Sequence, residues 1–420
     1  MKDKLPTKGC FSPDKIAQKL HVAELKIGMY VSKLDRDWLE TPFIMQGFVI
    51  EQMDDIAVLE EYCQHVWVDS IENIWVADDG RAVQGLPIRK VTYVNQVPAQ
   101  QEHRKALGVY REARRITKSL LDDIRLGGVI DTQKAKATVN ECVNSVVRNP
   151  DALMWMSKMR DQNEYTAEHC LNVCILSVAF GRHLGMDEPE LQRLGLCGIL
   201  HDVGKMKIPE SILDKPSALT TKEWKQMRAH TVHGRNLLMS SSGSDNSTVD
   251  VAYSHHERVD GTGYPRKLKA AAISVYARII AIVDAFDAMT ADRCYAPSIT
   301  STEALKIIFK DKGSHFDSRL AQEFIKCVGL YPPGCIVELM NGMVAIVLES
   351  NHRYKHLPKI IVVQSHHGEF SREKILTLAD IERDQLSRKY LIQRVLRDGS
   401  FGVFLKNYQE KGLIFRSPVK

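Results

Sequence analysis

The stretch ELQRLGLCGILHDVGK, residues 190–205, joins an apolar helical pattern to two adjacent side chains of metal-binding type, His201 and Asp202. The apolar run predicts a buried helix, and the pair lies near its end. Because adjacent residues on a helix point about 100° apart, one histidine and one aspartate serve neighbouring metals only if the aspartate bridges them. Taken alone, however, a His-Asp dipeptide is more often a core histidine with satisfied hydrogen bonds beside a capping aspartate.

Two further groups of polar side chains occur with apolar runs. His255 and His256 come directly after VDVAYS, and two histidines at the end of an apolar helix are costly to bury without partners. A surface turn that carries both histidines is the alternative. Asp284 lies within the apolar pattern ARIIAIVDAFDAM, where a buried carboxylate needs a cation or several hydrogen-bond donors. Arg278 is the alternative partner for this carboxylate, in a structural ion pair.

Histidines on two other predicted helices complete the set. His169 is surrounded by apolar residues, and a lone histidine there would more often be a core residue than a ligand. His230 and His233 are one turn apart and share a face, so only one of them has to be a ligand. If one of these two histidines is counted, the chain has seven candidate ligands. A single metal ion needs fewer ligands than this. The mixture is rich in imidazole and carboxylate and poor in thiolate, which argues against a structural zinc site and favours two ions sharing a carboxylate, as in hydrolases.

The composition excludes several classes of protein. The 420 residues are too many for one ordinary core, so we expect two or three domains. The net charge of +5 is spread along the chain, unlike the clustered footprint of a nucleic-acid-binding protein. The nine cysteines contain no CxxC motif, which favours reduced thiols. The opening residues lack an apolar secretory signal, and charged side chains interrupt the most apolar stretch, residues 270–289. We therefore expect a cytoplasmic protein with no membrane span.

Changes of pattern along the chain predict four regions. A small α+β module, with a regulatory or oligomerisation role, precedes a helical connector, a mainly helical domain and a small β-containing appendage. Their expected bounds are 1–100, 101–149, 150–335 and 336–420.

Local signals place several helices within these regions. The first connector helix should end at Gly127-Gly128, and the second should run from Thr132 to Arg148. Within the appendage we expect a helical segment from about Leu378 to Arg397. Capping-box spacing, in which a cap oxygen and a downstream carboxylate satisfy orphan backbone donors, occurs at Asp187…Glu190, Thr220…Glu223 and Thr300…Glu303.

Together, these residues spell a known pattern: YTxxH at 165–169, HDVGK at 201–205, HxxxG at 230–234, HHExxDGxGYP at 255–265 and RIIAIVDAFDAMTADR at 278–293. The pattern resembles the HD-GYP domain, the helical subgroup of HD phosphohydrolases associated with cyclic di-GMP breakdown, over roughly residues 150–335. The stretch LKIGMYVSKLDRDWLETPF near the N-terminus resembles a small module of unknown function that often precedes HD-GYP domains. The implied architecture is multidomain, with a mainly α-helical HD-type metallophosphohydrolase domain.

The resemblance also implies a ligand set for two metals. One metal would be held by His169, His201, Asp202 and Asp284, and the other by Asp202, His230, His255 and His256. Asp202 would then be the bridge that the ligand count requires. Iron is the typical ion in the family, with manganese or another divalent ion as the alternative.

The implied activity is hydrolysis of a cyclic dinucleotide by a metal-bridging hydroxide. Cyclic di-GMP would become linear pGpG, with further hydrolysis to GMP left open. The alternative substrate is 3′,3′-cyclic GMP-AMP, because the sequence identifies no base-reading residue. Lys205 and Asp202 would be the catalytic pair, with Lys205 stabilising phosphate charge or protonating the departing ribose oxygen. The candidate substrate contacts are Lys205, Arg293, Asp260, Gly261 and Tyr264.

The chain departs from the family pattern at two positions. Tyr165 stands where some members have a glutamate that recruits a third metal, so we expect two metals. Arg293 is followed by Cys-Tyr-Ala, without the lysine that some members use to hold a phosphate. Arg293 is therefore the retained phosphate contact in this segment.

Other classes of function are weighed against this one. The main alternative is a catalytically weak module that binds the nucleotide or docks onto a diguanylate cyclase (GGDEF) protein, and a degenerate ligand set would favour it. An HD hydrolase acting on deoxynucleoside triphosphates would lack the GYP segment. A nucleic-acid-binding protein would interleave clustered basic and aromatic residues. Diguanylate cyclase proteins and a second copy of the chain are the candidate protein partners.

Overall fold

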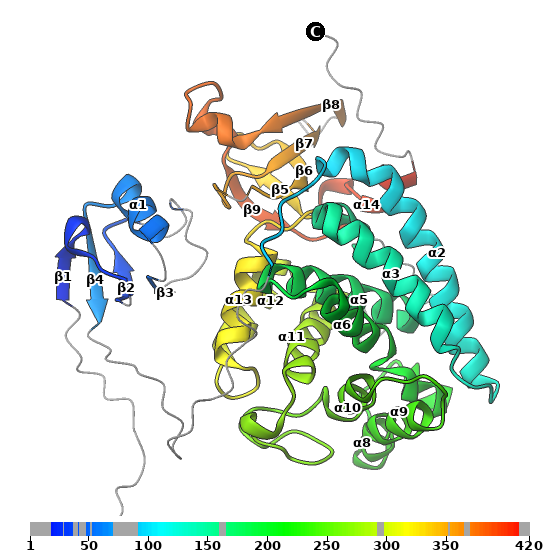
Figure 1. Cartoon of the computed structure of the whole chain (residues 1–420). Coiled ribbons are helices and arrows are strands. Elements are labelled where there is room, and N and C mark those ends of the chain that lie inside the picture. The colour runs from blue at the N-terminus through cyan, green and yellow to red at the C-terminus, as the bar shows by residue number, and fades with distance from the viewer. Residues whose placement is uncertain are drawn as a thin grey trace, which may run out of the picture. The chain divides into compact units, whose positions relative to one another are not determined.

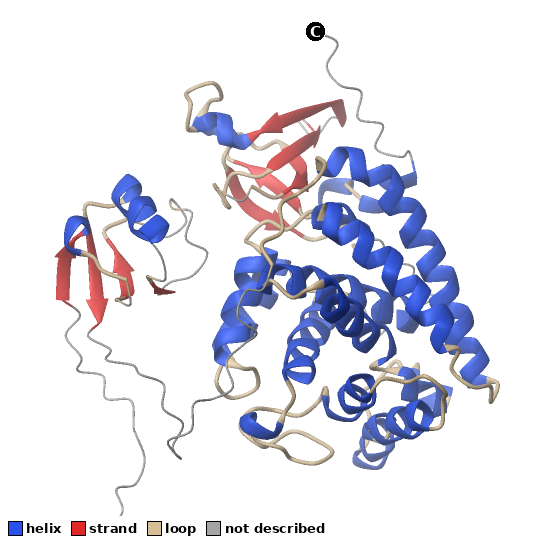
Figure 2. Ribbon diagram, viewed as in Figure 1, coloured by secondary structure: helices blue, strands red, loops and turns tan. Residues whose placement is uncertain are grey.

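The computed structural model shows a multidomain chain that divides into two compact units, residues 1–83 and 84–420 (Figure 1). Helices dominate the second unit, and each unit also contains a sheet (Figure 2). The structure describes residues 18–27, 29–36, 41, 48–50, 53–69, 91–158, 165–291, 298–351, 353–364 and 370–410.

The first unit is the expected small α+β module. Its antiparallel sheet has the strand order β1-β4-β2-β3. Helix α1 (Met53–Tyr62) supplies Leu59 to a core that also contains Val31 and Val66, all fully buried. The strands are β1 (Gln18–His21), β2 (Tyr30–Leu34), β3 (Phe48–Val49) and β4 (His65–Asp69).

The second unit begins with the two connector helices that the sequence predicts, α2 (Ala99–Arg125) and α3 (Thr132–Arg148). Gly127 follows α2 with a φ of +93°, a conformation that glycine adopts at little cost. A buried carboxylate joins the two helices, because Glu102 accepts hydrogen bonds from Ser145 and Arg148. The connector is thus packed as a helical hairpin.

The centre of the second unit is formed by helices α5 (Tyr165–Leu184), α6 (Glu188–Leu200) and α11 (Val275–Met289). Helix α11 contains most of the apolar stretch from residue 270 and is a core helix, as expected, with Ile279, Ile280 and Val283 fully buried. In the part of the chain that the structure describes, none of the helices combines the length and apolarity that a bilayer crossing requires.

The remaining helices surround this centre, and the predicted capping boxes begin two of them as well as the central helix α6. The boxes start α6, α8 and α12, where both reciprocal hydrogen bonds are present. The surrounding helices are α4 (Pro150–Met156), the 3-10 helix η4 (Val203–Lys207), α7 (Glu210–Leu213), α8 (Thr221–Arg228), α9 (His230–Met239), α10 (Asn246–Ser254), α12 (Ser301–Lys310) and α13 (Ser318–Val328).

The appendage is an antiparallel sheet with the strand order β8-β7-β6-β5-β9. Asp151 of α4 accepts hydrogen bonds from the backbone and hydroxyl of Ser350, which joins the sheet to the helical part. Its strands are β5 (Ile336–Leu339), β6 (Val344–Glu349), β7 (Lys359–Gln364), β8 (Phe370–Thr377) and β9 (Ile392–Leu396), followed by α14 (Leu405–Glu410).

The prediction of a helical segment from Leu378 to Arg397 is wrong. It contains two short 3-10 helices, Leu378–Ile381 and Arg388–Tyr390, and then strand β9. Strand β9 pairs with β5, and its Ile392 and Val395 pack against the core of the sheet. This long-range pairing overrides the local helical pattern, as tertiary context often does.

Candidate metal centre

The pair His201-Asp202 lies where α6 ends and η4 begins, as the sequence predicts. His201 is the C-cap of α6, and Asp202 precedes the first residue of η4. Gly204 allows the backbone of α9 to approach this turn, because a Cβ at position 204 would lie 1.9 Å from the carbonyl oxygen of His230. This close packing of η4 on α9 brings His230 beside Asp202.

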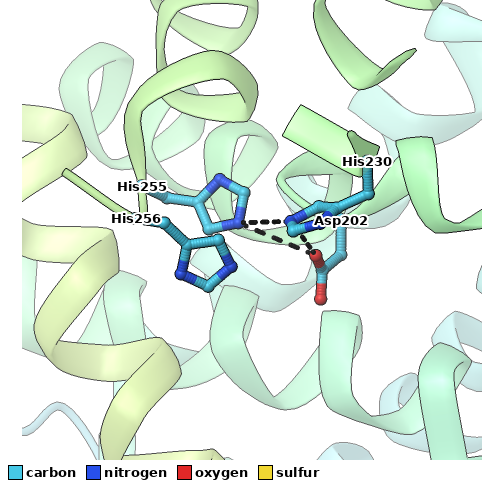
Figure 3. A group of neighbouring side chains, drawn as sticks. All are labelled: Asp202, His230, His255 and His256. Carbon is cyan, nitrogen blue, oxygen red and sulfur yellow. Dashed lines mark hydrogen bonds and ion pairs between the residues drawn. The ribbon is translucent and has the colours of Figure 1, made fainter. Parts of the chain in front are cut away.

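The two carboxylate oxygens of Asp202 face different imidazoles. Asp202 Oδ2 lies 3.5 Å from His169 Nε2 and 3.3 Å from His201 Nε2. Asp202 Oδ1 lies 3.4 Å from His230 Nε2 and 3.7 Å from His255 Nε2 (Figure 3). The carboxylate is buried between these two pairs of histidines, so the geometry is that of a bridging ligand.

Asp284 on helix α11 completes the cluster. Its Oδ1 lies 3.1 Å from His169 Nε2, and its Oδ2 lies 4.0 Å from His256 Nδ1. The alternative prediction, an ion pair between Asp284 and Arg278, is wrong, because Arg278 donates instead to Asp317 Oδ2 at 2.8 Å. Asp284 is therefore directed to the imidazoles.

Hydrogen bonds to acceptors set the orientation of four imidazoles. The Nδ1 atoms of His201, His230 and His255 lie 2.7, 2.7 and 3.0 Å from backbone carbonyl oxygens of residues three or four positions earlier in the chain. His169 Nδ1 lies 2.8 Å from Asp287 Oδ2. Since a carbonyl or carboxylate oxygen can only accept, each Nδ1 donates its proton and each Nε2 presents a lone pair to the cluster.

This arrangement leaves polar atoms that a cation would satisfy. His230 Nε2 and His255 Nε2 are 3.3 Å apart with their lone pairs facing each other. Within the described part of the chain, His201 Nε2 and Asp202 Oδ1 are buried and have no hydrogen-bond partner. Burying such atoms is unfavourable unless they are paired or coordinate a metal.

The protonation states also suit a divalent cation. Burial lowers the pKa of His230 to about 3 and holds the pKa of His256 well below its usual value, so both rings are neutral near pH 7. Burial opposes ionisation of Asp202, but the charge of the Lys205 ammonium beside it favours ionisation, and the pKa of this carboxyl lies well below its usual value. Burial likewise opposes ionisation of Asp284, and His169 lowers its pKa. Neutral imidazoles and ionised carboxylates are the forms that bind metals.

The seven side chains fall into three overlapping groups of potential ligands. Within each group, one donor atom from every residue lies within 4.8 Å of the others. The groups are Asp202 with His230, His255 and His256; His169 with His201 and Asp202; and His201 with His255 and Asp284. The donor set fits the two-metal hypothesis, and the identity of the ion is not specified by these residues.

The predicted substrate contacts have different positions. Lys205 Nζ lies 2.5 Å from Asp202 Oδ2, at the cluster. The ring of Tyr264 stacks on His256, with centroids 4.8 Å apart and an interplanar angle of 29°. Asp260 instead accepts hydrogen bonds from the backbone and hydroxyl of Thr262, and Gly261 has a φ of +80° within the same turn. Arg293 lies outside the described residues.

Glu257, the third residue of the HHE motif, positions the loop that carries Tyr264. Its buried carboxylate accepts hydrogen bonds from the backbone N–H groups of Arg266 and Leu268, at 2.6 and 2.9 Å. Gly263 is required in this loop, because a Cβ there would lie 2.4 Å from the backbone nitrogen of Arg258. The loop is thus held against the turn that carries His255 and His256.

Sequence reasoning missed two residues of the centre's surroundings. Asp287 orients His169, and its signal is the spacing of three residues from Asp284 on an apolar helix, which places both carboxylates on one face. The guanidinium carbon of Arg228 lies 5.0 Å from the centroid of the Tyr264 ring. No motif singles out Arg228, since its contact with Tyr264 is made across the fold.

A cavity of about 540 Å³ occurs elsewhere in the helical part. Its lining includes Arg235, Tyr253 and Arg266 and none of the seven potential ligands. The metal hypothesis therefore rests on the donor atoms of the cluster and not on this cavity.

Comparison with known proteins also identifies an HD domain in this chain. Residues 151–320 match the family described as an HD domain, and residues 17–135 match a domain of unknown function, DUF3391. The chain is 35% identical over 352 residues to the cyclic di-GMP phosphodiesterase PA4108 of Pseudomonas aeruginosa, covering 82% of this chain and 84% of the relative.

Two other relatives match shorter stretches of the chain. The cyclic di-GMP phosphodiesterase response regulator RpfG of Xanthomonas campestris is 40% identical over 147 residues, or 34% of this chain and 38% of the relative. The 3′3′-cGAMP-specific phosphodiesterase 3 of Vibrio cholerae is 32% identical over 171 residues, or 41% of this chain and 37% of the relative.

Proposed function

Because the chain belongs to the HD-GYP family of HD-domain proteins, we propose that it is a metal-dependent phosphodiesterase that hydrolyses a cyclic dinucleotide. The relatives described above act on cyclic di-GMP or on 3′,3′-cyclic GMP-AMP. The relative matched over most of its length is a cyclic di-GMP phosphodiesterase, so cyclic di-GMP is the leading substrate. The hybrid 3′,3′-cyclic GMP-AMP is the alternative.

The position of the Asp202 carboxylate is the observation that carries this proposal. One of its oxygens faces His169 and His201, and the other faces His230 and His255. We assign one metal to His169, His201, Asp202 and Asp284, and the other to Asp202, His230, His255 and His256. Iron is the leading ion, with manganese or another divalent ion as the alternative. When bound, two such ions would supply a water-derived nucleophile at neutral pH and neutralise charge on the phosphate oxygens.

Lys205 is the proposed source of positive charge and of a proton at the scissile phosphate. Its side chain is 20% exposed, whereas Asp202 beside it is 1% exposed. The ammonium group therefore lies between the buried cluster and solvent, where a phosphodiester would enter. From there it can stabilise charge on the phosphate or donate a proton to the departing ribose oxygen. The first product would be linear pGpG, with GMP as the product of a second cleavage.

The remaining substrate contacts are proposed with different support. Tyr264 is supported by its stacking on His256, a proposed ligand. Asp260 and Gly261 would act by shaping the loop, since the Asp260 side chain is used within the turn. Arg293 is proposed from the family pattern alone. Docking to diguanylate cyclase (GGDEF) proteins and formation of a homodimer are proposed without a structural observation. A cytoplasmic location is proposed from the cysteine pattern and from the charged side chains that interrupt the most apolar stretch.

The catalytic function is favoured over a non-catalytic binding module. A degenerate ligand set would indicate a binding module, yet all seven potential ligands are present and lie in one cluster. The orphaned atoms His201 Nε2 and Asp202 Oδ1 also support metal binding, which nucleotide binding alone would not require.

Product analysis tests the proposal directly. Protein purified without oxygen and loaded with iron or manganese is mixed separately with cyclic di-GMP and with 3′,3′-cyclic GMP-AMP, and the products are separated by chromatography. We expect metal-dependent linearisation by the wild-type protein and none by Asp202→Asn. Asp214→Asn is the matched control, because that aspartate is exposed and has no proposed role at the site. Absence of turnover of both substrates by metal-replete protein would shift the assignment to the binding module.

A further inference from the structure

We propose that Arg228 and Trp224 form a guanine-binding subsite next to the metal centre, and that Arg228 makes the enzyme prefer guanine over adenine. The inference rests on the proposed function and concerns the base of the cyclic dinucleotide. It supplies the base-reading residue that sequence motifs do not identify.

A row of stacked groups leads from solvent to the metal centre. Trp224 and Arg228 are one turn apart on helix α8, which places them on the same face. The guanidinium carbon of Arg228 lies 5.9 Å from the centroid of the Trp224 ring and 5.0 Å from that of Tyr264. Tyr264 in turn stacks on His256. Trp224 is 48% exposed, so the outer end of the row is open to a ligand.

The Arg228 guanidinium has N–H donors that the described residues do not use. Other arginines of the second unit are engaged by carboxylates, such as Arg148 with Glu102 and Arg278 with Asp317. No residue in the described ranges forms an ion pair or hydrogen bond with the Arg228 side chain; its contacts there are with aromatic rings. Because these ring contacts use none of its N–H groups in a hydrogen bond, the donor fork of the guanidinium remains available to a ligand.

A cyclic dinucleotide would bring a base to this row. When one phosphodiester lies at the metal cluster, the attached nucleoside must extend away from the buried ligands toward solvent. An exposed indole offers a face on which any base can stack. The donor fork of arginine pairs with the O6 and N7 acceptors of guanine, whereas adenine presents an amino donor in place of O6. Trp224 would thus stack on the base, and Arg228 would provide the preference for guanine over adenine.

This subsite accounts for both candidate substrates. Cyclic di-GMP and 3′,3′-cyclic GMP-AMP each contain a guanine that the fork could bind, whereas cyclic di-AMP contains none. Binding of the second phosphate by Arg228 is the competing role, and it predicts equal losses for all three nucleotides when the arginine is replaced.

The test compares these three nucleotides with metal-loaded, full-length protein. In Arg228→Gln we expect the preference for cyclic di-GMP over cyclic di-AMP, measured as the ratio of kcat/KM, to fall about tenfold or more, since glutamine pairs with adenine instead. The loss should appear mainly in KM, with the metal content equal to that of the wild type. Arg228→Lys should also lose the preference, because lysine keeps the charge and lacks the fork. Trp224→Leu should raise KM for all three.

Arg235→Gln is the matched control. Arg235 also stacks on a tyrosine, with its guanidinium carbon 5.1 Å from the centroid of the Tyr253 ring, but it lines the separate cavity. An unchanged nucleotide preference in Arg228→Gln, or an equal loss for all three nucleotides, would overturn the subsite while leaving the phosphodiesterase assignment intact. If the wild-type protein hydrolyses none of the three, equilibrium binding to wild type and Arg228→Gln measures the same preference, and equal ratios overturn the inference.

Discussion

His169 Nδ1 lies 2.8 Å from Asp287 Oδ2, so a carboxylate outside the ligand set orients one of the proposed metal ligands. Such a contact sets the tautomer of the ring and makes its other nitrogen a better donor to a metal. Helix α11 therefore contributes to the centre twice, through Asp284 as a proposed ligand and through Asp287 as a positioning residue.

Replacement of Asp287 should weaken metal binding without removing a ligand. We expect Asp287→Asn to lower metal affinity by about 10- to 100-fold, because the asparagine no longer supports the donor tautomer of His169 as strongly. Titration of the metal-free protein with Mn²⁺ measures the affinity. Asp214→Asn, at an exposed aspartate, is the control. Equal affinities in the two variants would show that Asp287 has no positioning role.

Bridging by Asp202 predicts a distinctive metal stoichiometry. Asp202→Asn should lose both ions, because its two oxygens face both groups of histidines. His230→Gln should lose one ion, because His230 belongs to one group alone. Elemental analysis of purified variants by mass spectrometry measures the ion content. Loss of the same number of ions in both variants would contradict the bridge.

Lys205 should affect turnover more than metal content. In Lys205→Gln we expect kcat to fall by about 10²- to 10⁴-fold, the usual contribution of a positioned proton donor. The ion content should stay close to that of the wild type. Lys207→Gln is a matched control on the same 3-10 helix, since the Lys207 ammonium reaches the Ile124 carbonyl and not the cluster. A normal kcat in Lys205→Gln would exclude its catalytic role.

Replacement of glycine by alanine should have opposite effects on stability at two positions. Gly204→Ala should destabilise the protein by about 1–3 kcal/mol and reduce its metal content, because the new Cβ would meet the His230 carbonyl oxygen at 1.9 Å. Gly108→Ala on helix α2 meets no atom within 4 Å and should raise stability by about 0.5–1 kcal/mol. Urea unfolding measures both changes. A Gly204→Ala protein as stable as wild type would refute the close packing of η4 on α9.

The pKa of His103, a half-buried histidine away from the centre, leads to a prediction about the pH dependence of stability. Burial lowers the pKa of His103 from 6.5 to about 4, and its ring lies edge-on to Trp155. Between these values the unfolded chain binds a proton that the folded chain does not, so the contribution of His103 to stability falls as pH falls from 6.5 toward 4. Between pH 7 and pH 5, His103→Leu should therefore lose about 2 kcal/mol less stability than the wild-type protein loses. Parallel losses in urea unfolding would contradict the shift.

Local signals in the sequence were sufficient for most of the helical framework. The capping boxes at Asp187, Thr220 and Thr300 begin helices as predicted, because a cap is formed by residues three positions apart. The residue types of the seven potential ligands were likewise readable, since spacing along an apolar helix identifies polar side chains that need partners. The same local logic failed between Leu378 and Arg397, where strand β9 depends on pairing with β5.

The sequence by itself determined which side chains were available for a metal centre and on which elements they lie. Only the tertiary structure decided how they meet: which oxygen of Asp202 faces which imidazoles, that Arg278 pairs with Asp317 and not with Asp284, and that Arg228 lies against Tyr264. Apart from the neighbours His201 and Asp202, these relationships join residues that are tens of positions apart in the chain. Helical periodicity and capping act over a few residues, whereas such contacts arise when α6, α9, α10 and α11 pack together.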